Sequence, residues 1–170
     1  LARQESTRGE AGWRREEAGL RLGAVLFTDQ ARRVVDWIQT APDARWTAVN
    51  LGRVQSWGMT ASASRTLDDR WSLHGAYTVL DKQTEESVRA SRYALDYARH
   101  ELRAGIRLAP FPNWQIDLWQ TFGRYASNPA RRSGATERES NLELRYRLSR
   151  YGLMLAAGVA NGWDCDFETL

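Results

Sequence analysis

Strict alternation of apolar and polar side chains is the feature of this sequence that most limits how the chain can fold. Apolar residues recur at every second position over runs of seven to nine residues, and one clear run reads Leu-Glu-Leu-Arg-Tyr-Arg-Leu at 142–148. A period of two places the two sets of side chains on opposite faces of an extended strand, whereas a helix needs a period near 3.6. The pattern therefore predicts an all-β protein whose strands each have one apolar face.

Seven stretches follow this template, and we expect each of them to form a strand. The clearest lie at 71–79, 102–108, 114–122 and 142–148, weaker ones lie at 20–26, 57–63 and 153–159, and 33–39 is a candidate eighth. Tight turns at 67–70, 110–113 and 149–151 alternate with long connections at about 31–53, 81–99 and 123–137. We therefore expect an antiparallel up-and-down sheet with short turns at one end and long loops at the other.

Strand length and aromatic placement favour a barrel in a membrane over a soluble barrel. Strands in soluble domains average about 5 to 6 residues. Nine residues at ~3.3 Å each, tilted by ~40°, span about 23 Å, which is close to the ~25 Å apolar band of an outer-membrane barrel. Trp71, Trp114 and Tyr151 lie at or beside the short turns, where an aromatic girdle at the membrane interface is expected. Short turns alternating with long loops are also typical of such barrels.

The charged residues of these strands fall on the face opposite the apolar one. They include Arg103, Asp117, Glu143, Arg145 and Arg147. An arginine on the lipid face at the bilayer midplane costs about 2 to 4 kcal/mol. We therefore expect the charged face to line a wet lumen.

Composition excludes several other classes of protein. A chain that is 42% hydrophobic and 11% aromatic is not disordered, and its single Cys cannot build a disulfide framework or a thiolate zinc site. The net charge of +3 comes from 24 basic residues interleaved with 21 acidic ones, so no basic stripe marks a nucleic-acid partner. The two histidines, His74 and His100, lie far from Cys165 in the strand order. We expect no catalysis, no metal site and no cofactor.

Two segments resemble motifs of the TonB-dependent outer-membrane receptors. Residues 50–59, Asn-Leu-Gly-Arg-Val-Gln-Ser-Trp-Gly-Met, resemble an Asn-Leu-Gly-like opening that precedes a Gly and an apolar residue on a descending strand. Thr60 stands where the family often has Glu. Residues 158–168 resemble the family's penultimate-strand ending, although Gly162 replaces the usual Leu and Cys165 is atypical. The strand at 71–80, the loop after it and the strand led by 97–102 are also similar to the family's rhythm.

This resemblance implies a partial, antiparallel up-and-down transmembrane β-barrel, with about 7–8 strands of a larger barrel of about 22. Residues 1–170 would be the C-terminal portion of that barrel, with the plug domain and the final strand outside the chain. The implied location is the outer membrane of a Gram-negative cell. The implied function is TonB-dependent uptake of a ferric siderophore or cobalamin, and the tight loops favour cobalamin slightly.

The resemblance also implies partners and contact residues. The partners are the remaining barrel, the plug, outer-membrane lipid and lipopolysaccharide, the TonB complex through N-terminal regions outside this chain, and the nutrient itself. Arg and Tyr side chains of the long loops are candidates to contact that nutrient, namely Arg92, Tyr93, Tyr97 and Tyr125. The charged lumen residues named above would pair across strands or position the plug.

Two other functions fit the alternation. One is a small, complete eight-stranded outer-membrane barrel with a structural or adhesion role. The other is a soluble, lipocalin-like barrel, in which the apolar face of 142–148 would point inward and the arginines outward. Contact of the apolar face with lipid separates the membrane proteins from the soluble one.

Overall fold

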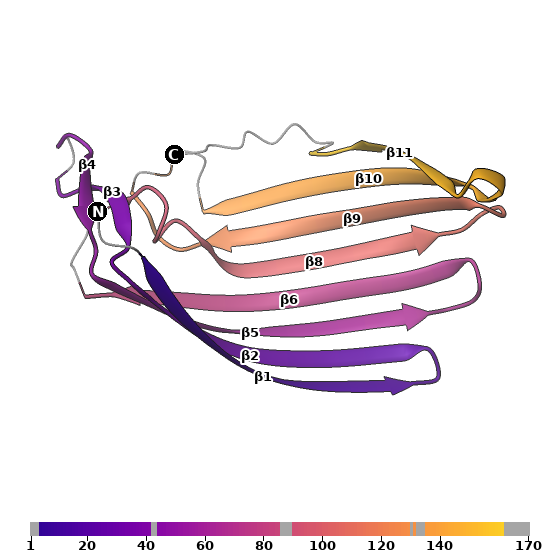
Figure 1. Cartoon of the computed structure of the whole chain (residues 1–170), viewed down its shortest axis with the longest axis horizontal. Helices are drawn as coiled ribbons and strands as arrows, with labels where there is room; N and C mark the ends of the chain where they lie inside the picture. Colours follow the sequence, from indigo (N-terminus) through magenta and orange to yellow (C-terminus); the bar gives the residue numbers. More distant parts are fainter. Residues whose placement is uncertain (1–3, 42–43, 86–89, 130, 132–134, 162–170) are drawn as a thin grey trace.

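The chain folds into one long antiparallel sheet with a small sheet at one end, shown in Figure 1. The computed structural model describes residues 4–41, 44–85, 90–129, 131 and 135–161. The large sheet has eight strands in the order β1-β2-β5-β6-β8-β9-β10-β11, and the small sheet has three in the order β4-β3-β7. The prediction of an all-β, up-and-down architecture is confirmed, and the large sheet is open rather than closed.

The strand bounds show where the sequence prediction was right and where it was wrong. The large sheet contains β1 (Glu5–Glu17), β2 (Leu20–Arg32), β5 (Arg53–Thr66), β6 (Trp71–Thr84), β8 (Ala98–Leu108), β9 (Trp114–Tyr125), β10 (Thr136–Leu148) and β11 (Leu153–Val159). The small sheet contains β3 (Val35–Gln39), β4 (Thr47–Asn50) and β7 (Ala90–Ser91). All seven predicted strands are present. The candidate at 33–39 also forms a strand, but it lies in the small sheet, and the eighth strand of the wall is β1.

Most wall strands are longer than their apolar runs. Seven of them have 11 to 14 residues, and β11 has 7. Pairing continues past the apolar stretch into polar residues such as Gln83 and Thr84, which pair with Gln55 and Val54. Backbone hydrogen bonding therefore extends the strands beyond the part that alternation marks.

Four tight connections lie together at one end of the large sheet, on the right in Figure 1. Ala18 and Gly19 join β1 to β2 with φ angles of 45° and 78°, the left-handed pair that a two-residue type I′ turn requires. Asp68 closes the β5–β6 turn by accepting hydrogen bonds of 2.8 Å from the backbone N–H groups of Arg70 and Trp71. A 3-10 turn, η1 (Ser149–Tyr151), joins β10 to β11. The three long connections lie at the opposite end, as predicted.

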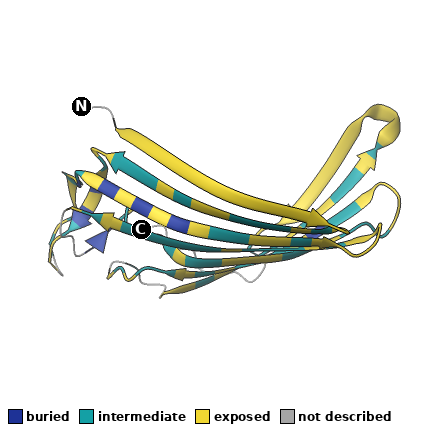
Figure 2. Ribbon diagram, turned by 90° about the horizontal axis from the view of Figure 1, so that it is seen from below, coloured by how far each residue is buried: buried dark blue, intermediate teal, exposed yellow. Residues whose placement is uncertain are grey.

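The apolar face of the sheet is its exposed face. Trp57 and Met59 on β5 are 54% and 40% exposed, whereas Ser56 and Gly58, which alternate with them and lie on the other face, are buried. The same alternation of exposed and buried residues runs along a strand in Figure 2. On β9, Leu118 is 49% exposed and Asp117 only 2%. This is the reverse of a soluble protein, in which the covered face is the apolar one.

The buried core is small and lies at the long-loop end. It consists of Ile38, Leu51 and Val54, with Val34, Val49 and Ala94 packed around them. Leu51 is fully buried. The described residues include no helix of the length and apolarity needed to cross a membrane.

Candidate functional site

A buried carboxylate, Asp36 on β3, joins the first two long loops. Asp36 is 1% exposed. Its Oδ1 accepts hydrogen bonds from the backbone N–H groups of Trp37 at 2.7 Å and Tyr93 at 3.2 Å, and its Oδ2 accepts one from Ala94 at 2.9 Å. The hydroxyl of Ser91 also donates to Oδ2. Hydrogen bonds to an ionised acceptor are roughly twice as strong as neutral ones, so Asp36 holds the β6–β8 loop against β3.

Strand pairing supports the same junction. Ile38 and Gln39 on β3 pair with Ser91 and Ala90 on β7, and β3 also pairs with β4. The backbone N–H of Arg92 donates to the carbonyl of Trp37 at 3.0 Å. The small sheet is therefore made from two loops that are distant in the sequence.

Arg131 attaches the third long loop to this cluster. Its Nε and Nη2 donate to the two carboxylate oxygens of Asp96 at 3.1 and 3.0 Å, and its guanidinium lies 3.5 Å from the centroid of the Tyr125 ring. Asn128 donates from Nδ2 to the carbonyl of Ser91 at 2.7 Å. Burial opposes the charge of Arg131, but the hydrogen bonds to Asp96 and the nearby negative charges outweigh it and raise the pKa of the guanidinium. The three long loops thus form one packed unit, which we call the loop cluster.

The structure places all four candidate ligand residues in or beside the loop cluster. Tyr93 is 61% exposed, and the Arg92 guanidinium lies 5.8 Å from its ring centroid. The Nε of Arg92 is buried and has no hydrogen-bond partner among the described residues. Tyr97 and Tyr125 already have partners within the protein, so of the four only Arg92 and Tyr93 leave polar atoms or ring surface unengaged.

Tyr97 is held by β6. Its hydroxyl donates to Asp81 Oδ1 at 3.4 Å and accepts from the backbone N–H of Lys82 at 3.0 Å. The Lys82 ammonium lies 5.0 Å from the Tyr97 ring centroid. Burial raises the pKa of the Tyr97 phenol, with a further increase from Asp81. These contacts give Tyr97 a structural role at the start of β8.

Charged side chains form a network on the polar face near the short turns. The register places Asp117 opposite both Arg107 and Glu143, so all three share a face. Arg107 Nε donates to Asp117 Oδ1 at 2.7 Å, and Arg145 Nη1 lies 3.5 Å from Asp117 Oδ2. Arg145 also donates to both oxygens of Glu143, at 2.7 and 2.8 Å. Within the network, Asp117 contacts Arg107 and Arg145 on the two neighbouring strands, whereas Arg145 and Glu143 pair within β10.

The remaining two predicted lumen residues share this face. Arg103 pairs with Glu101 on its own strand at 2.9 Å. Arg147 lines a hollow of about 220 Å³ together with Arg107 and Arg145. All five predicted residues are therefore on one face, although they do not form a single cluster.

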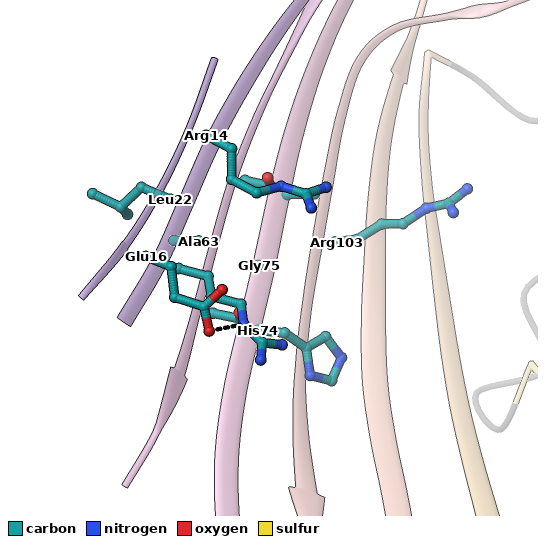
Figure 3. A pocket seen from close by; sticks show the side chains of 12 residues that line it. Arg14, Glu16, Leu22, Ala63, His74, Gly75 and Arg103 are labelled. Atoms are coloured by element: carbon teal, nitrogen blue, oxygen red, sulfur yellow. Dashed lines mark hydrogen bonds and ion pairs between the residues drawn. The ribbon is translucent and has the colours of Figure 1, made fainter. Parts of the chain in front are cut away.

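A larger hollow of about 640 Å³ lies on the polar face over β1, β2, β5, β6 and β8, shown in Figure 3. Arg14, Glu16, His74 and Arg103 line it, and Glu16 forms an ion pair of 2.8 Å with Arg21. Arg14 and Glu16 were not predicted, because β1 has no alternating apolar face that marks it as a strand. The alternation predicted that His74 lies on the polar face, but nothing in the sequence predicted that it lines a hollow.

The aromatic residues on the exposed face form two bands. The predicted girdle residues Trp71, Trp114 and Tyr151 lie at the short-turn end and are 45%, 37% and 66% exposed. A second band, which was not predicted, consists of Tyr77 and Phe122, both directly opposite Leu102 in the strand register. Trp57 lies on the same face four residues nearer the long loops, and all three are at least 40% exposed. Its members share the parity of the apolar residues on their strands, so the sequence did contain the signal.

No group of three or more His, Cys, Asp or Glu side chains within the described ranges is placed to hold a metal ion. Cys165 and the acidic-aromatic ending of the 158–168 motif lie outside the described residues.

Comparison with known proteins identifies the family. The family model described as TonB dependent receptor-like, beta-barrel, matches residues 1–161. Curated proteins contain no match. Among solved structures, the copper transporter OprC aligns with a TM-score of 0.65 and 18% identity over 97% of this chain and 26% of its own. A mutant of the ferric enterobactin receptor PfeA from Pseudomonas aeruginosa aligns with a TM-score of 0.61 and 16% identity, over 95% and 26%.

These likenesses agree with the geometry. The chain spans about a quarter of the length of the solved structures it matches. An open sheet with an exposed apolar face is what part of a large membrane barrel requires, and it fits neither a closed small barrel nor a soluble one. The chain belongs to the TonB-dependent receptor family and forms part of its outer-membrane β-barrel.

Proposed function

We propose that this chain is a wall segment of an outer-membrane receptor that takes up a scarce nutrient with energy supplied through TonB. The observation that carries the proposal is the exposed apolar face bounded by two aromatic bands. Trp114 and Phe122 are both on that face of β9, eight positions apart. Eight residues at ~3.3 Å extend about 26 Å, or about 20 Å along the membrane normal for a strand tilted by ~40°. That span suits the apolar band of an outer membrane.

We propose that the wall continues on both sides of the large sheet. β1 and β11 each have one neighbouring strand within the described part of the sheet. Unpaired backbone groups at a sheet edge are not tolerated in lipid, so these edges call for further strands of the same barrel. On this reading residues 1–170 are a C-terminal portion of the barrel.

We further propose that a plug domain packs against the polar face. Asp117, Glu143 and Arg145 are already paired with one another or with Arg107, whereas Arg147 lines a hollow beside them. A cation facing an open hollow suits a carboxylate or carbonyl on a packed partner. Arg147 is the residue that we expect to meet the plug most directly. Arg103 is a second, because it lines the larger hollow although it also pairs with Glu101.

The nutrient is proposed to contact the loop cluster at Arg92 and Tyr93. The solved relatives are described as a ferric enterobactin receptor and a copper transporter, so metal-containing solutes are the substrate class they support. Neither of these relatives supports the slight preference for cobalamin. We propose transport rather than catalysis.

Two measurements test the proposal. In the full-length receptor, reconstituted in vesicles with Cys165→Ser, a spin label at Leu118→Cys is expected to be more accessible to oxygen than to a water-soluble nickel complex. A label at Thr121→Cys, on the polar face, is expected to show the reverse. A nickel-accessible label at position 118 would overturn the membrane assignment.

Uptake by cells tests the transport itself. Cells with the full-length receptor are expected to accumulate ferric enterobactin or copper in a TonB-dependent manner. Cells without the receptor provide the baseline. Equal uptake of ferric enterobactin, copper and cobalamin with and without the receptor would contradict the proposed transport while leaving the membrane assignment intact.

A further inference from the structure

Two arginines lie at the edge of the second aromatic band on the exposed face, one level with Phe122 and one just beyond it. Arg124 is two residues past Phe122 on β9, and Arg138 on β10 is directly paired with Phe122. In the strand register, Arg124 lies opposite His100 on β8. Register therefore places Arg124, Arg138 and His100 on the face that carries the apolar residues, toward the long-loop end.

Neither arginine has an anionic partner within the part of the chain that the structure describes. The guanidinium groups of Arg124 and Arg138 form no ion pair or side-chain hydrogen bond with another described residue, and Arg138 lies 5.9 Å from the Phe122 ring centroid. Nearby arginines at the same end are paired, since Arg99 contacts Asp81 at 3.2 Å and Arg131 contacts Asp96 at 3.0 Å. Arg124 and Arg138 are thus two unneutralised cations beside the aromatic side chain of Phe122 on the exposed face.

A hollow of about 290 Å³ lies between these cations and the apolar band. Tyr77, His100, Leu102 and Phe122 line it together with both arginines. The Tyr77 hydroxyl and His100 Nδ1 are 2.8 Å apart, and their rings stack with centroids 6.2 Å apart. Glu137 also lines the hollow, but its carboxylate lies 3.9 Å from Arg131, within the loop cluster. The hollow therefore has an apolar, aromatic wall and a cationic rim.

The position of the rim along the strand suggests what occupies it. Aromatic side chains of a barrel mark the boundary between acyl chains and headgroups. Arg124 is two residues beyond this boundary, about 6.6 Å along the strand at ~3.3 Å per residue, which is the level of the headgroups. Guanidinium groups bind phosphate oxygens through paired N–H donors. An anionic headgroup above an acyl chain matches the rim and the wall of the hollow together.

We propose that Arg124 and Arg138 bind the phosphate group of an outer-leaflet lipid, whose acyl chain packs on Leu102 and Phe122. The inference rests on the proposed function, because it requires the apolar face to contact lipid. His100 and Tyr77 complete the rim by presenting a hydrogen-bonded pair beside Arg124. The site is on the outside of the wall, away from the nutrient and the plug.

Native mass spectrometry of the full-length receptor in detergent tests this site with two lipids of identical acyl chains. Dioleoyl phosphatidic acid carries a phosphate monoester, and dioleoylglycerol lacks it. The unmodified receptor is expected to retain one phosphatidic acid in preference to dioleoylglycerol. The double variant R124Q/R138Q is expected to lose this preference by about tenfold or more, since it removes charge-assisted hydrogen bonds.

Arg65→Gln is the matched control. Arg65 is an exposed arginine on the same face of β5, but it lies near the short turns. R65Q is expected to bind phosphatidic acid as the unmodified receptor does. Equal loss in R65Q and R124Q/R138Q, unchanged binding in R124Q/R138Q, or equal retention of dioleoylglycerol would each overturn the proposal.

Two further readouts separate the possible failures. Competition by millimolar inorganic phosphate alone, without any preference for the lipid, would mean a free-anion site and would overturn the lipid assignment. Quenching of tryptophan fluorescence by brominated lipid reports on the apolar face as a whole. If tryptophan fluorescence is quenched but phosphatidic acid is not preferred, only the headgroup site is overturned. If there is no quenching, the assignment of the apolar face to the membrane, on which the site rests, is overturned as well.

Discussion

Arg107 on β8 and Asp117 on β9 are directly paired across the two strands, and Arg107 Nε donates a 2.7 Å hydrogen bond to Asp117 Oδ1. The Asp117 side chain is 3% exposed, whereas that of Arg107 is 52% exposed. Ile106 and Leu118, next to them in the sequence, point to the opposite, apolar face. The same two strands therefore present an ion pair to one side and aliphatic side chains to the other.

Replacing Asp117 by Asn is expected to destabilise the wall. The change keeps the shape of the side chain but removes the charge that Arg107 and Arg145 share, at an expected cost of about 1 to 3 kcal/mol. Urea unfolding of the full-length receptor in detergent measures this cost. Glu101→Gln breaks a more exposed pair with Arg103 and is expected to cost less than about 1 kcal/mol. Equal effects of the two variants would show that Asp117 has no special role.

Replacing Leu118 by Arg tests which face contacts lipid. An arginine there is expected to cost about 2 to 4 kcal/mol and to lower the yield of assembled receptor in the outer membrane. Thr121→Arg places the same side chain on the polar face of β9 and is expected to assemble nearly normally. Comparable assembly of both variants would argue against a lipid-facing role for Leu118.

Position 105 must be glycine because the side chain of His74, opposite it on β6, leaves no room for a Cβ atom. A Cβ at this position would lie 2.2 Å from Nε2 of His74 and 2.8 Å from the carbonyl oxygen of Leu118. Gly105→Ala is expected to destabilise the receptor by about 1 to 3 kcal/mol because the neighbours must shift. The loss is measured by urea unfolding.

A second substitution separates the two contacts of Gly105. His74→Ala is expected to rescue G105A only in part, since the contact with the Leu118 backbone remains. Gly75→Ala serves as the control, because its Cβ would meet the nearest atom at an ordinary 3.6 Å. Full rescue by His74→Ala would mean that the backbone contact relaxes freely.

Asp36→Asn is expected to loosen the loop cluster without unfolding the wall. The substitution replaces a charged acceptor of several hydrogen bonds by an amide, so the loops should open more often. Limited proteolysis of the full-length receptor is expected to cut within the loops faster. Urea unfolding should change less than for D117N. Asp69→Asn, in a short turn at the other end, should leave the cleavage rate unchanged, and equal cleavage of both variants would contradict the role of Asp36.

Alternation was sufficient to predict the strands that carry one clear apolar face. Leu142, Leu144, Tyr146 and Leu148 on β10 are one example, and their partners on β9 are another. β1 escaped because small and charged residues occupy both of its faces, as in Arg8, Gly9 and Glu10. Its pairing with β2 depends on backbone hydrogen bonds, which leave no trace in side-chain hydropathy.

The loop cluster could not be predicted from the sequence. Asp36 is separated by 55 to 58 residues from Ser91, Tyr93 and Ala94, which it contacts. No periodicity links such distant residues, and the short strands that bring them together have few side chains each. The approximate location of candidate ligand residues was predictable, because loop length identified the end of the sheet where they lie. The sequence did not predict which of these residues are already engaged by contacts within the protein.

The strict alternation of apolar and polar side chains also affects how such a chain is exported. The longest uncharged apolar stretch, at 152–160, has nine residues. This is about half of what a helix needs to be retained in a lipid bilayer, so no stretch of the unfolded chain would halt its passage through an inner membrane. A continuous apolar surface forms only when neighbouring strands pair, because pairing places their apolar side chains on the same face of the sheet. The hydrophobicity that anchors this protein is thus hidden during transit and emerges with assembly.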